Sequence, residues 1–390
     1  MRRKSLLLGM TMVFAVLAGL GGSQPAGSAG WLPPVRHVFV IALENASFAQ
    51  SYGPNSQIPY LAQPLRSQGV LLSQYYGTAH YSMGNYMAIV GGVAPNADIQ
   101  MDCPEYQDML HPSEAPGGQV KAAAGCIFPA PVPTLTAQLT SRSLSWKGYM
   151  EDMGNIPGRE EPTCGKPSLG PGSADLTQKA TAGDAYAARH NPFLYFASVA
   201  ATPACAANVL SLARLPQDLA TVSTTPNFSL VSPSLCNDGH DQSCPGQAAG
   251  PGAEDAWLRT WIPRVMASPA YRQDGAIIIV NDEAGGDTSA CCREPSGPNV
   301  PYPGLPPSAA QDGTFAAGPG AGKGGGRVGA LILSPFVRPG TTSSNPYNHY
   351  SLLRSIEDLF GLPHLGYAAT PGLARFGTDV WAVVPSATSP

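Results

Sequence analysis

Short runs of β-branched and aliphatic residues recur along the chain and predict buried strands. These runs are residues 38–43, 70–75, 193–199, 228–231, 276–280 and 328–333. Amphipathic patterns at 59–67, 83–90, 134–141, 253–266 and 350–360 predict helices between them. Because near-continuous apolar strands alternate with helices, the pattern predicts an α/β fold. Its central sheet should be mostly parallel, with helices on both faces.

Two long stretches, residues 154–183 and 293–326, are rich in glycine and proline and have no clear periodicity. The whole chain has 390 residues with 44 Gly and 40 Pro, so long loops are expected. We interpret both stretches as loop excursions over the functional face of one domain, not as linkers. Residues 31–390 are therefore predicted to form a single domain.

The first 30 residues have the layout of a secretory signal peptide. Arg2, Arg3 and Lys4 are followed by an apolar run over 6–20 and then by small residues. A membrane anchor is the alternative, but the run is short of the roughly 20 residues that a spanning helix needs. The segment predicts a secreted, extracellular or periplasmic protein with no stable membrane anchor.

Eight cysteines follow this segment, and an even number in an exported chain favours disulfides. A zinc site is the alternative, but no CxxC pair is present. Cys236 and Cys244 bracket a short loop that they could close. Cys291 and Cys292 are adjacent, and we expect each to bond to a different partner.

The charge distribution disfavours a nucleic-acid binder. Lys and Arg total 22 against 26 Asp and Glu, for a formal net charge of -4. No basic run occurs after the first four residues, so no nucleic-acid partner is expected.

Polar residues follow the ends of five predicted strands, where ligands bind in open α/β sheets. They are Glu44 and Asn45; Thr78, His80 and Ser82; Asn237, Asp238, His240 and Asp241; Asn281, Asp282 and Glu283; and Asn348 and His349. Hard oxygen ligands with a few imidazoles are what a divalent cation needs. Singly, each residue has an ordinary role as a helix cap or turn residue. Their joint occurrence favours a metal-assisted site.

Several segments that carry these residues resemble, in order, the motifs of a known family. They are LENASFAQSYG, HYSMGNYMAIVGG, WKGYMEDM, HNPFLYF, CNDGHD, VNDEAGGD and NHYSLLRSIEDLFGL. Over residues 35 to 365 or so, the chain resembles the secreted bacterial phosphoesterases of acid phosphatase and phospholipase C type. That family belongs to the alkaline-phosphatase-like superfamily, so the resemblance implies its α/β fold.

The resemblance also implies which residues surround a metal. They are Glu44, Asn45, Ser82, Asp282 and Glu283, with Asp238, His240 and His349 nearby to orient water or bind a second ion. Tyr81 and Gly84 stand where the family often has proline. Glu283 stands where the two-zinc alkaline phosphatases have histidine. Metal number and identity, among Zn, Ca, Mg and Mn, therefore stay open.

Ser82 is the candidate nucleophile. A serine hydroxyl needs activation, and no G-x-S-x-G elbow surrounds it, so metal coordination is the expected activator. It precedes an apolar helix whose free N–H groups would face a phosphate. Asn85 would donate to a phosphoryl oxygen, and His80 would lie near the leaving group. The alternative is that Ser82 only caps the helix.

These features predict a metal-dependent phosphomonoesterase acting on a small phosphorylated substrate or a phospholipid head group. A phosphodiesterase of phospholipase C type shares the nucleophile and metal. A sulfatase is disfavoured because its Cys/Ser-x-Pro-x-Arg signature is absent. A secreted binding protein on a degenerate hydrolase scaffold is the alternative from another class, although none of the central residues is missing. The oligomeric state stays open.

Overall fold

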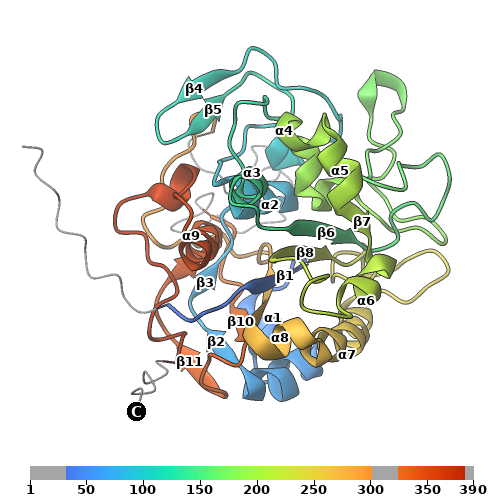
Figure 1. Ribbon diagram of the computed structural model, residues 1–390. Coiled ribbons are helices and arrows are strands. Elements are labelled where there is room, and N and C mark those ends of the chain that lie inside the picture. The colour runs from blue at the N-terminus through green and yellow to red at the C-terminus, as the bar shows by residue number, and fades with distance from the viewer. Residues whose placement is uncertain (1–31, 301–323, 383–390) are drawn as a thin grey trace, which may run out of the picture. The chain divides into compact units, whose positions relative to one another are not determined.

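The computed structural model describes residues 32–300 and 324–382. The predicted signal peptide and the middle of the 293–326 excursion lie outside these ranges. The described chain builds an eight-stranded sheet in the order β11-β2-β10-β9-β1-β8-β6-β7 (Figure 1). Its strands are β1 (His37–Leu43), β2 (Val70–Leu72), β6 (Trp146–Met150), β7 (Val209–Ser211), β8 (Phe228–Ser232), β9 (Gly275–Asn281), β10 (Ala330–Leu333) and β11 (Thr341–Ser343).

The sheet is mostly parallel, as predicted. β1 pairs in parallel with β8 and β9, and β10 alone runs antiparallel to its neighbours β9 and β2. The β1–β9 register runs from His37 opposite Gly275 to Leu43 opposite Asn281. Both strands therefore end at the same level, and the residues that follow them emerge side by side.

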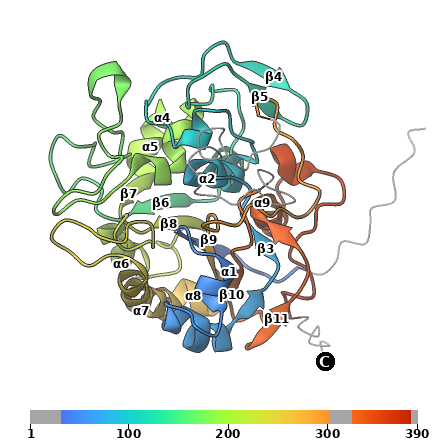
Figure 2. The same ribbon diagram turned by 180° about the vertical axis from the view of Figure 1, so that it is seen from behind.

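Helices cover both faces of the sheet (Figures 1 and 2). Val38, Val40 and Ala42 of β1 pack in a core cluster with α2 (Ser82–Gly91), α3 (Leu135–Ser141) and α9 (His349–Phe360). The alternate residues of β1 pack in a second cluster with α6 (Leu215–Asp218), α7 (Pro251–Ala267) and α8 (Pro269–Asp274). All seven β1 side chains are buried, which explains the continuous apolar run.

The remaining elements are short. They are α1 (Phe48–Tyr52), α4 (Ala197–Ala200), α5 (Pro203–Asn208), and the two-stranded pairs β3 (Tyr75–Tyr76) with β12 (Tyr347–Asn348) and β4 (Ser113–Ala115) with β5 (Gln119–Lys121). The first glycine-rich excursion, 154–183, consists of turns with one 3₁₀ turn at Pro171–Ser173. No helix within the described ranges has the length and apolar character to cross a membrane.

The predicted strand at 193–199 is wrong. This segment is a 3₁₀ turn, Pro192–Tyr195, followed by α4. Its apolar residues are buried, and a short buried run does not distinguish a strand from a helical turn by periodicity. The sheet positions are filled instead by β6 and β7, whose short and partly polar sequences gave no strand signal. The predicted helix at 59–67 becomes a π turn and a 3₁₀ turn, because Pro64 lies inside it.

All eight cysteines are paired. The disulfides are Cys103–Cys126, Cys164–Cys205, Cys236–Cys244 and Cys291–Cys292. The predicted closure of the 236–244 loop is confirmed. The expectation that Cys291 and Cys292 bond to different partners is wrong, because the other six cysteines already pair among themselves.

Candidate active site

Three carboxylates lie at the common end of β1 and β9. Glu44 follows β1, and Asp282 and Glu283 follow β9; all three are buried. The Asn45 and Glu283 backbone N–H groups both donate to Asp282 Oδ1, at 3.1 and 2.6 Å. The parallel register of the two strands thus brings together acids that are more than 230 positions apart.

Ser82 lies against this cluster. It is the first residue of α2, whose N-cap is Tyr81, so the Ser82 side chain does not cap the helix. Its hydroxyl donates to Glu44 Oε2 at 2.7 Å, and Tyr86 Oη donates to Glu44 Oε1 at 3.0 Å. The predicted nucleophile and a predicted metal ligand are therefore in direct contact.

One of the backbone N–H groups at the start of α2 is already hydrogen-bonded within the protein. The Met83 N–H donates to Asp102 Oδ1 at 2.9 Å, so this group is not free to bind a phosphate. Burial raises the pKa of Asp102 to about 6, although the nearby Arg189 charge lowers it. A carboxylate therefore occupies part of the helix N-terminus where the sequence predicted an anion site.

The Asn85 side chain binds the preceding loop and not the pocket. Its Oδ1 accepts from the Thr78 and Ala79 N–H groups at 2.8 and 2.9 Å, and its Nδ2 donates to Ala79 O at 2.9 Å. Asn85 thus fixes the turn that leads into Ser82, and its contact with a phosphoryl oxygen stays a prediction.

The imidazoles of His80 and His349 support the segment that carries the acids. His80 pairs through Nδ1 with Glu283 and through Nε2 with Asp287 O at 2.9 Å. His349 Nε2 lies 2.6 Å from Asp282 O, and its Nδ1 lies 3.1 Å from Tyr75 Oη. Burial lowers the pKa of His349 to about 4. Burial also acts to lower the pKa of His80, but the Glu283 charge and the hydrogen bonds to Glu283 and Asp287 O together raise it. Both rings are engaged at both nitrogens.

Asp238 and His240 lie together on the loop after β8. Asp238 is buried, and its Oδ1 accepts from the His240 N–H at 2.8 Å. The His240 side chain is 28% exposed, so it reaches the surface of the site. The structure therefore brings the loop that follows β8 to the same edge as Glu44 and Ser82.

Sequence reasoning missed His190. Its Nε2 lies 3.2 Å from Glu44 Oε1, its Nδ1 lies 3.2 Å from Asp238 Oδ2, and its ring stacks on Tyr86 with the centroids 5.4 Å apart. The apolar residues of the HNPFLYF segment predict a strand, whereas the histidine at its start is the feature that indicates a ligand.

Glu44, His190 and Asp238 offer ligand atoms that all lie within 4.8 Å of one another. Both His190 nitrogens and Asp238 Oδ2 are buried and make no hydrogen bond within the described residues, and the same is true of Asp282 Oδ2. Buried polar atoms without hydrogen bonds are costly unless an ion or water satisfies them. This donor set of carboxylates and an imidazole fits a divalent cation.

The pKa shifts of these residues also favour a bound cation. Burial, followed by the charges of Asp282 and Asp238, raises the pKa of Glu44 well above its usual value. Burial and the Glu283 charge raise the pKa of Asp282 to about 8. Burial lowers the pKa of His190, which keeps the ring in the neutral form that binds metals. A cation at this position would neutralise the mutual repulsion of the acids.

A pocket of about 520 Å³ opens over the cluster. Its lining is Asn45, Gln50, Tyr81, Ser82, His240, Glu283, Gly285 and Gly286. The Ser82 hydroxyl and the exposed imidazole of His240 thus share one cavity beside the acids.

The chain belongs to the Phosphoesterase family, whose model matches residues 54–363. Among named relatives, a probable acid phosphatase of Kluyveromyces lactis is 23% identical over 85% of this chain and 59% of its own length. A phosphatidylinositol-3-phosphatase of Mycobacterium tuberculosis is 23% identical over 95% of this chain and 96% of its own. An acid phosphatase of Aspergillus fumigatus is 22% identical, and the chain spans 55% of its length. The chain thus covers little more than half of the yeast and mould acid phosphatases.

Solved structures of low similarity include a Vibrio parahaemolyticus protein of the alkaline phosphatase superfamily. It is 14% identical with a TM-score of 0.46, and the match covers 90% of this chain and 73% of the other. A lipoteichoic acid synthase from Listeria monocytogenes matches with a TM-score of 0.45 at 12% identity, over 92% of this chain and 78% of its own.

Proposed function

We propose that this protein is a metal-dependent phosphatase that hydrolyses phosphate monoesters through Ser82. The observation that carries the proposal is the 2.7 Å contact between Glu44 and the hydroxyl of Ser82, which lines the pocket. The names of its relatives, acid phosphatases and a phosphoinositide phosphatase, support a monoester as substrate. The substrate class would be small phosphorylated molecules or phospholipid head groups.

The metal would be held by Glu44, Asp282 and Glu283, with the Asn45 amide oxygen and Ser82 completing the set. Asp238 and His190 would hold a second ion or complete the first together with Glu44. A bound divalent cation would favour the ionised hydroxyl and neutralise phosphate charge. Because phosphoryl transfer needs mainly positioning and charge neutralisation, this arrangement requires little other machinery.

The chain's own groups would then act in two steps. The Ser82 Oγ–P bond would form as the bond to the leaving oxygen breaks; the hydroxyl proton of Ser82 would pass to solvent water, and the leaving oxygen would take a proton from water. A second water would then attack the phosphoseryl ester and the Oγ–P bond would break, so that one proton of that water returns to Ser82 Oγ and phosphate leaves. His240 on the pocket wall is placed to orient that water.

The decisive experiment compares Ser82→Ala with Ser268→Ala on a chromogenic phosphomonoester. Ser268 lies directly before α8 (Pro269–Asp274), and its hydroxyl caps that helix by accepting from the Tyr271 N–H. We expect Ser82→Ala to lower kcat by at least about 10³-fold with metal content retained. Ser268→Ala should cost about 1 kcal/mol of stability and leave kcat unchanged.

The same assay separates the competing functions. Loss of activity on chelation and recovery with a divalent cation are expected for the wild-type protein. Faster hydrolysis of a phosphodiester chromogen than of the monoester would favour the phospholipase C type instead. A metal-loaded wild-type protein that binds phosphate esters without turnover would support the degenerate binding scaffold. Near-normal turnover in folded Ser82→Ala would refute the serine mechanism.

A further inference from the structure

A second cavity adjoins the pocket over Ser82. Its volume is about 140 Å³, and Asn45 and Gln50 line both cavities. Ser82 lines the first cavity and Glu44 lines the second. In phosphoryl transfer the leaving oxygen lies roughly in line with the attacking oxygen, on the far side of phosphorus. A substrate whose phosphate contacts Ser82 can therefore extend across Asn45 and place its leaving group in the second cavity.

Glu254 lines this second cavity with a carboxyl group that is not fully paired. It lies in the first turn of α7 and is only 1% exposed. Its Oε1 is buried and makes no hydrogen bond within the described residues. Because a buried polar atom without a partner is costly, such an atom at the wall of a cavity favours a ligand that donates to it.

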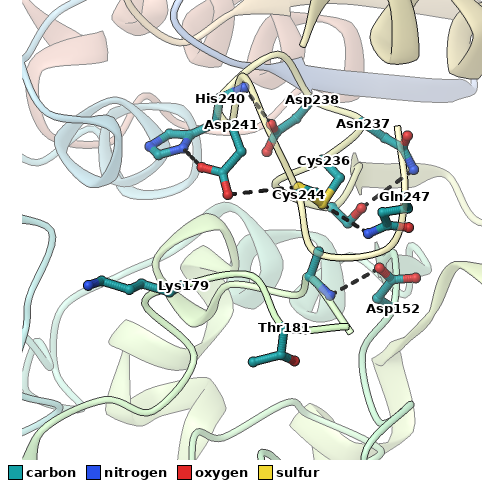
Figure 3. Close-up of a disulfide and its surroundings, with 12 residues drawn as sticks. Asp152, Lys179, Thr181, Cys236, Asn237, Asp238, His240, Asp241, Cys244 and Gln247 are labelled. Atoms are coloured by element: carbon teal, nitrogen blue, oxygen red, sulfur yellow. Dashed lines mark hydrogen bonds and ion pairs between the residues drawn. A yellow bond between two sulfur atoms is a disulfide. The ribbon is translucent and has the colours of Figure 1, made fainter. Parts of the chain in front are cut away.

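Part of the cavity wall comes from the loop that follows β8. Gly239 and Gln242 line the cavity, and the Cys236–Cys244 disulfide closes the loop that carries them (Figure 3). Gly239 has a φ of 103°, and a β carbon at this position would lie 2.8 Å from Glu254 Oε2. Glycine is therefore needed here both for its backbone conformation and for the space that it leaves beside the carboxyl group.

The other polar side chains of the cavity are mainly amides. Gln50, Gln57 and Gln242 line it, and an amide group both donates and accepts hydrogen bonds. Glu44 offers no free oxygen, because its two oxygens already accept from hydroxyl groups of α2. No Lys or Arg of the described residues lines the cavity, so it does not favour an anionic group. A hydroxyl group, which also donates and accepts, matches this lining.

We propose that the second cavity binds the leaving group of the substrate and selects an alcohol with several hydroxyl groups. This inference rests on the proposed function, because it names the substrate class of the same site. The hydroxyl groups would bond to Glu254 and to the glutamine amides, and the carbon atoms would pack on Ile58 and Pro251. The volume equals that of about five water molecules, which suits a small polyol such as glycerol.

The first test compares three phosphate esters of similar length on the wild-type protein. Propyl phosphate lacks the two free hydroxyl groups of glycerol 1-phosphate, and ethanolamine phosphate replaces them with an ammonium group. We expect kcat/KM for glycerol 1-phosphate to exceed that for propyl phosphate by about tenfold or more. Equal values, or a preference for ethanolamine phosphate, would overturn the proposal. Hydrolysis of none of the three would refute the proposed function itself, and this inference with it.

The second test replaces the unpaired acid with an apolar side chain of similar size. Glu254→Leu removes a buried carboxyl group, so Tm should stay the same or rise. The ratio of kcat/KM between glycerol 1-phosphate and propyl phosphate should fall by about fivefold or more. A structural role for Glu254 predicts the opposite result, a lower Tm with an unchanged ratio, and that result would overturn the assignment.

Two exposed glutamines provide a matched pair. Gln57 lines the second cavity, whereas Gln63 lies in the π turn Leu61–Leu65 and lines a different pocket. Gln57→Ala should lower the same ratio of kcat/KM, and Gln63→Ala should keep the wild-type ratio. A wild-type ratio in both Gln57→Ala and Glu254→Leu would refute the subsite while leaving the proposed function intact.

A polyol phosphate in solution and a phospholipid head group present the same hydroxyl groups. Glycerol 1-phosphate and vesicles of phosphatidylcholine with a phosphatidylinositol monophosphate distinguish these two sources. Slower hydrolysis of the vesicle lipid by Glu254→Leu than by wild type would show that the head group enters the cavity. An effect confined to glycerol 1-phosphate would identify a free polyol phosphate as the substrate, and an effect on neither would overturn the proposal.

Discussion

At the scale of single residues, Asp282 shows how the site is prepared for a cation. One carboxylate oxygen accepts two backbone N–H groups, from Asn45 and Glu283, and the other makes no hydrogen bond within the described residues. Burial and the charge of Glu283 raise the Asp282 pKa to about 8. A cation that binds at this cluster therefore competes with protons for the buried carboxylates.

We expect Asp282→Asn to lose bound metal and activity together. Asp274 is a matched control, because it precedes β9 at the opposite end of the strand and pairs with His37 at 2.5 Å. Asp274→Asn should lower stability and retain the metal. Elemental analysis of both dialysed variants measures the difference, and a full complement of metal in Asp282→Asn would show that the ligands lie elsewhere.

At the scale of elements, helix α9 contains a buried glutamate, Glu357, that lies outside the candidate active site. Glu357 is buried, and its Oε1 accepts from the Leu365 N–H at 2.9 Å, which fixes the chain after the helix. Burial raises the pKa of Glu357 to about 9. The folded protein thus binds a proton here that the unfolded chain, with a pKa of about 4.3, releases.

A pH-dependent stability difference follows from this shift. Because the folded pKa lies above the unfolded one, the contribution of Glu357 to stability is complete below about pH 4 and is lost as pH rises towards 9. Glu357→Gln keeps the acceptor oxygen and cannot ionise. Its advantage over wild type should be absent near pH 4 and grow to a few kcal/mol by pH 9.

Thermal midpoints across this pH range measure the effect. Glu114→Gln, at an exposed position of β4, controls for the removal of one negative charge. A difference between Glu357→Gln and wild type that does not change with pH would contradict the assignment.

At the scale of the whole molecule, the disulfides Cys103–Cys126 and Cys164–Cys205 lie in the core cluster on the α2 face of the sheet. Cys236–Cys244 packs in a smaller cluster beside the loop that follows β8, and Cys291–Cys292 completes the four. Paired cysteines suit an oxidising compartment, which agrees with the predicted export signal. We propose that the protein is secreted and that cleavage falls between about Gly22 and Trp31.

Protein from culture medium should therefore begin within that interval and show no thiol when it is denatured without reductant. N-terminal sequencing and thiol titration measure the two properties. An intact Met1 in a membrane fraction would contradict export, and six or more free thiols would contradict the disulfide framework.

The sequence by itself determined the α/β architecture and most of the acidic cluster. Strands buried on both faces leave continuous apolar runs, and acids that directly follow two such runs must emerge together when the strands are parallel neighbours. Glu44, Asp282 and Ser82 could therefore be placed from local patterns alone, as could the closed loop between Cys236 and Cys244.

Only the tertiary structure decided which polar groups face the pocket. His349 and His190 are both buried imidazoles, but His349 contacts Asp282 O and Tyr75 Oη, whereas His190 faces Glu44 and Asp238. Asn85 binds the backbone of the preceding loop. The structure also decided the conformation of residues 192–195, which form a 3₁₀ turn. This turn is as apolar as a buried strand because other elements cover it. Local periodicity records that a side chain is buried, whereas its partners depend on contacts between distant segments, and these form only when the chain folds.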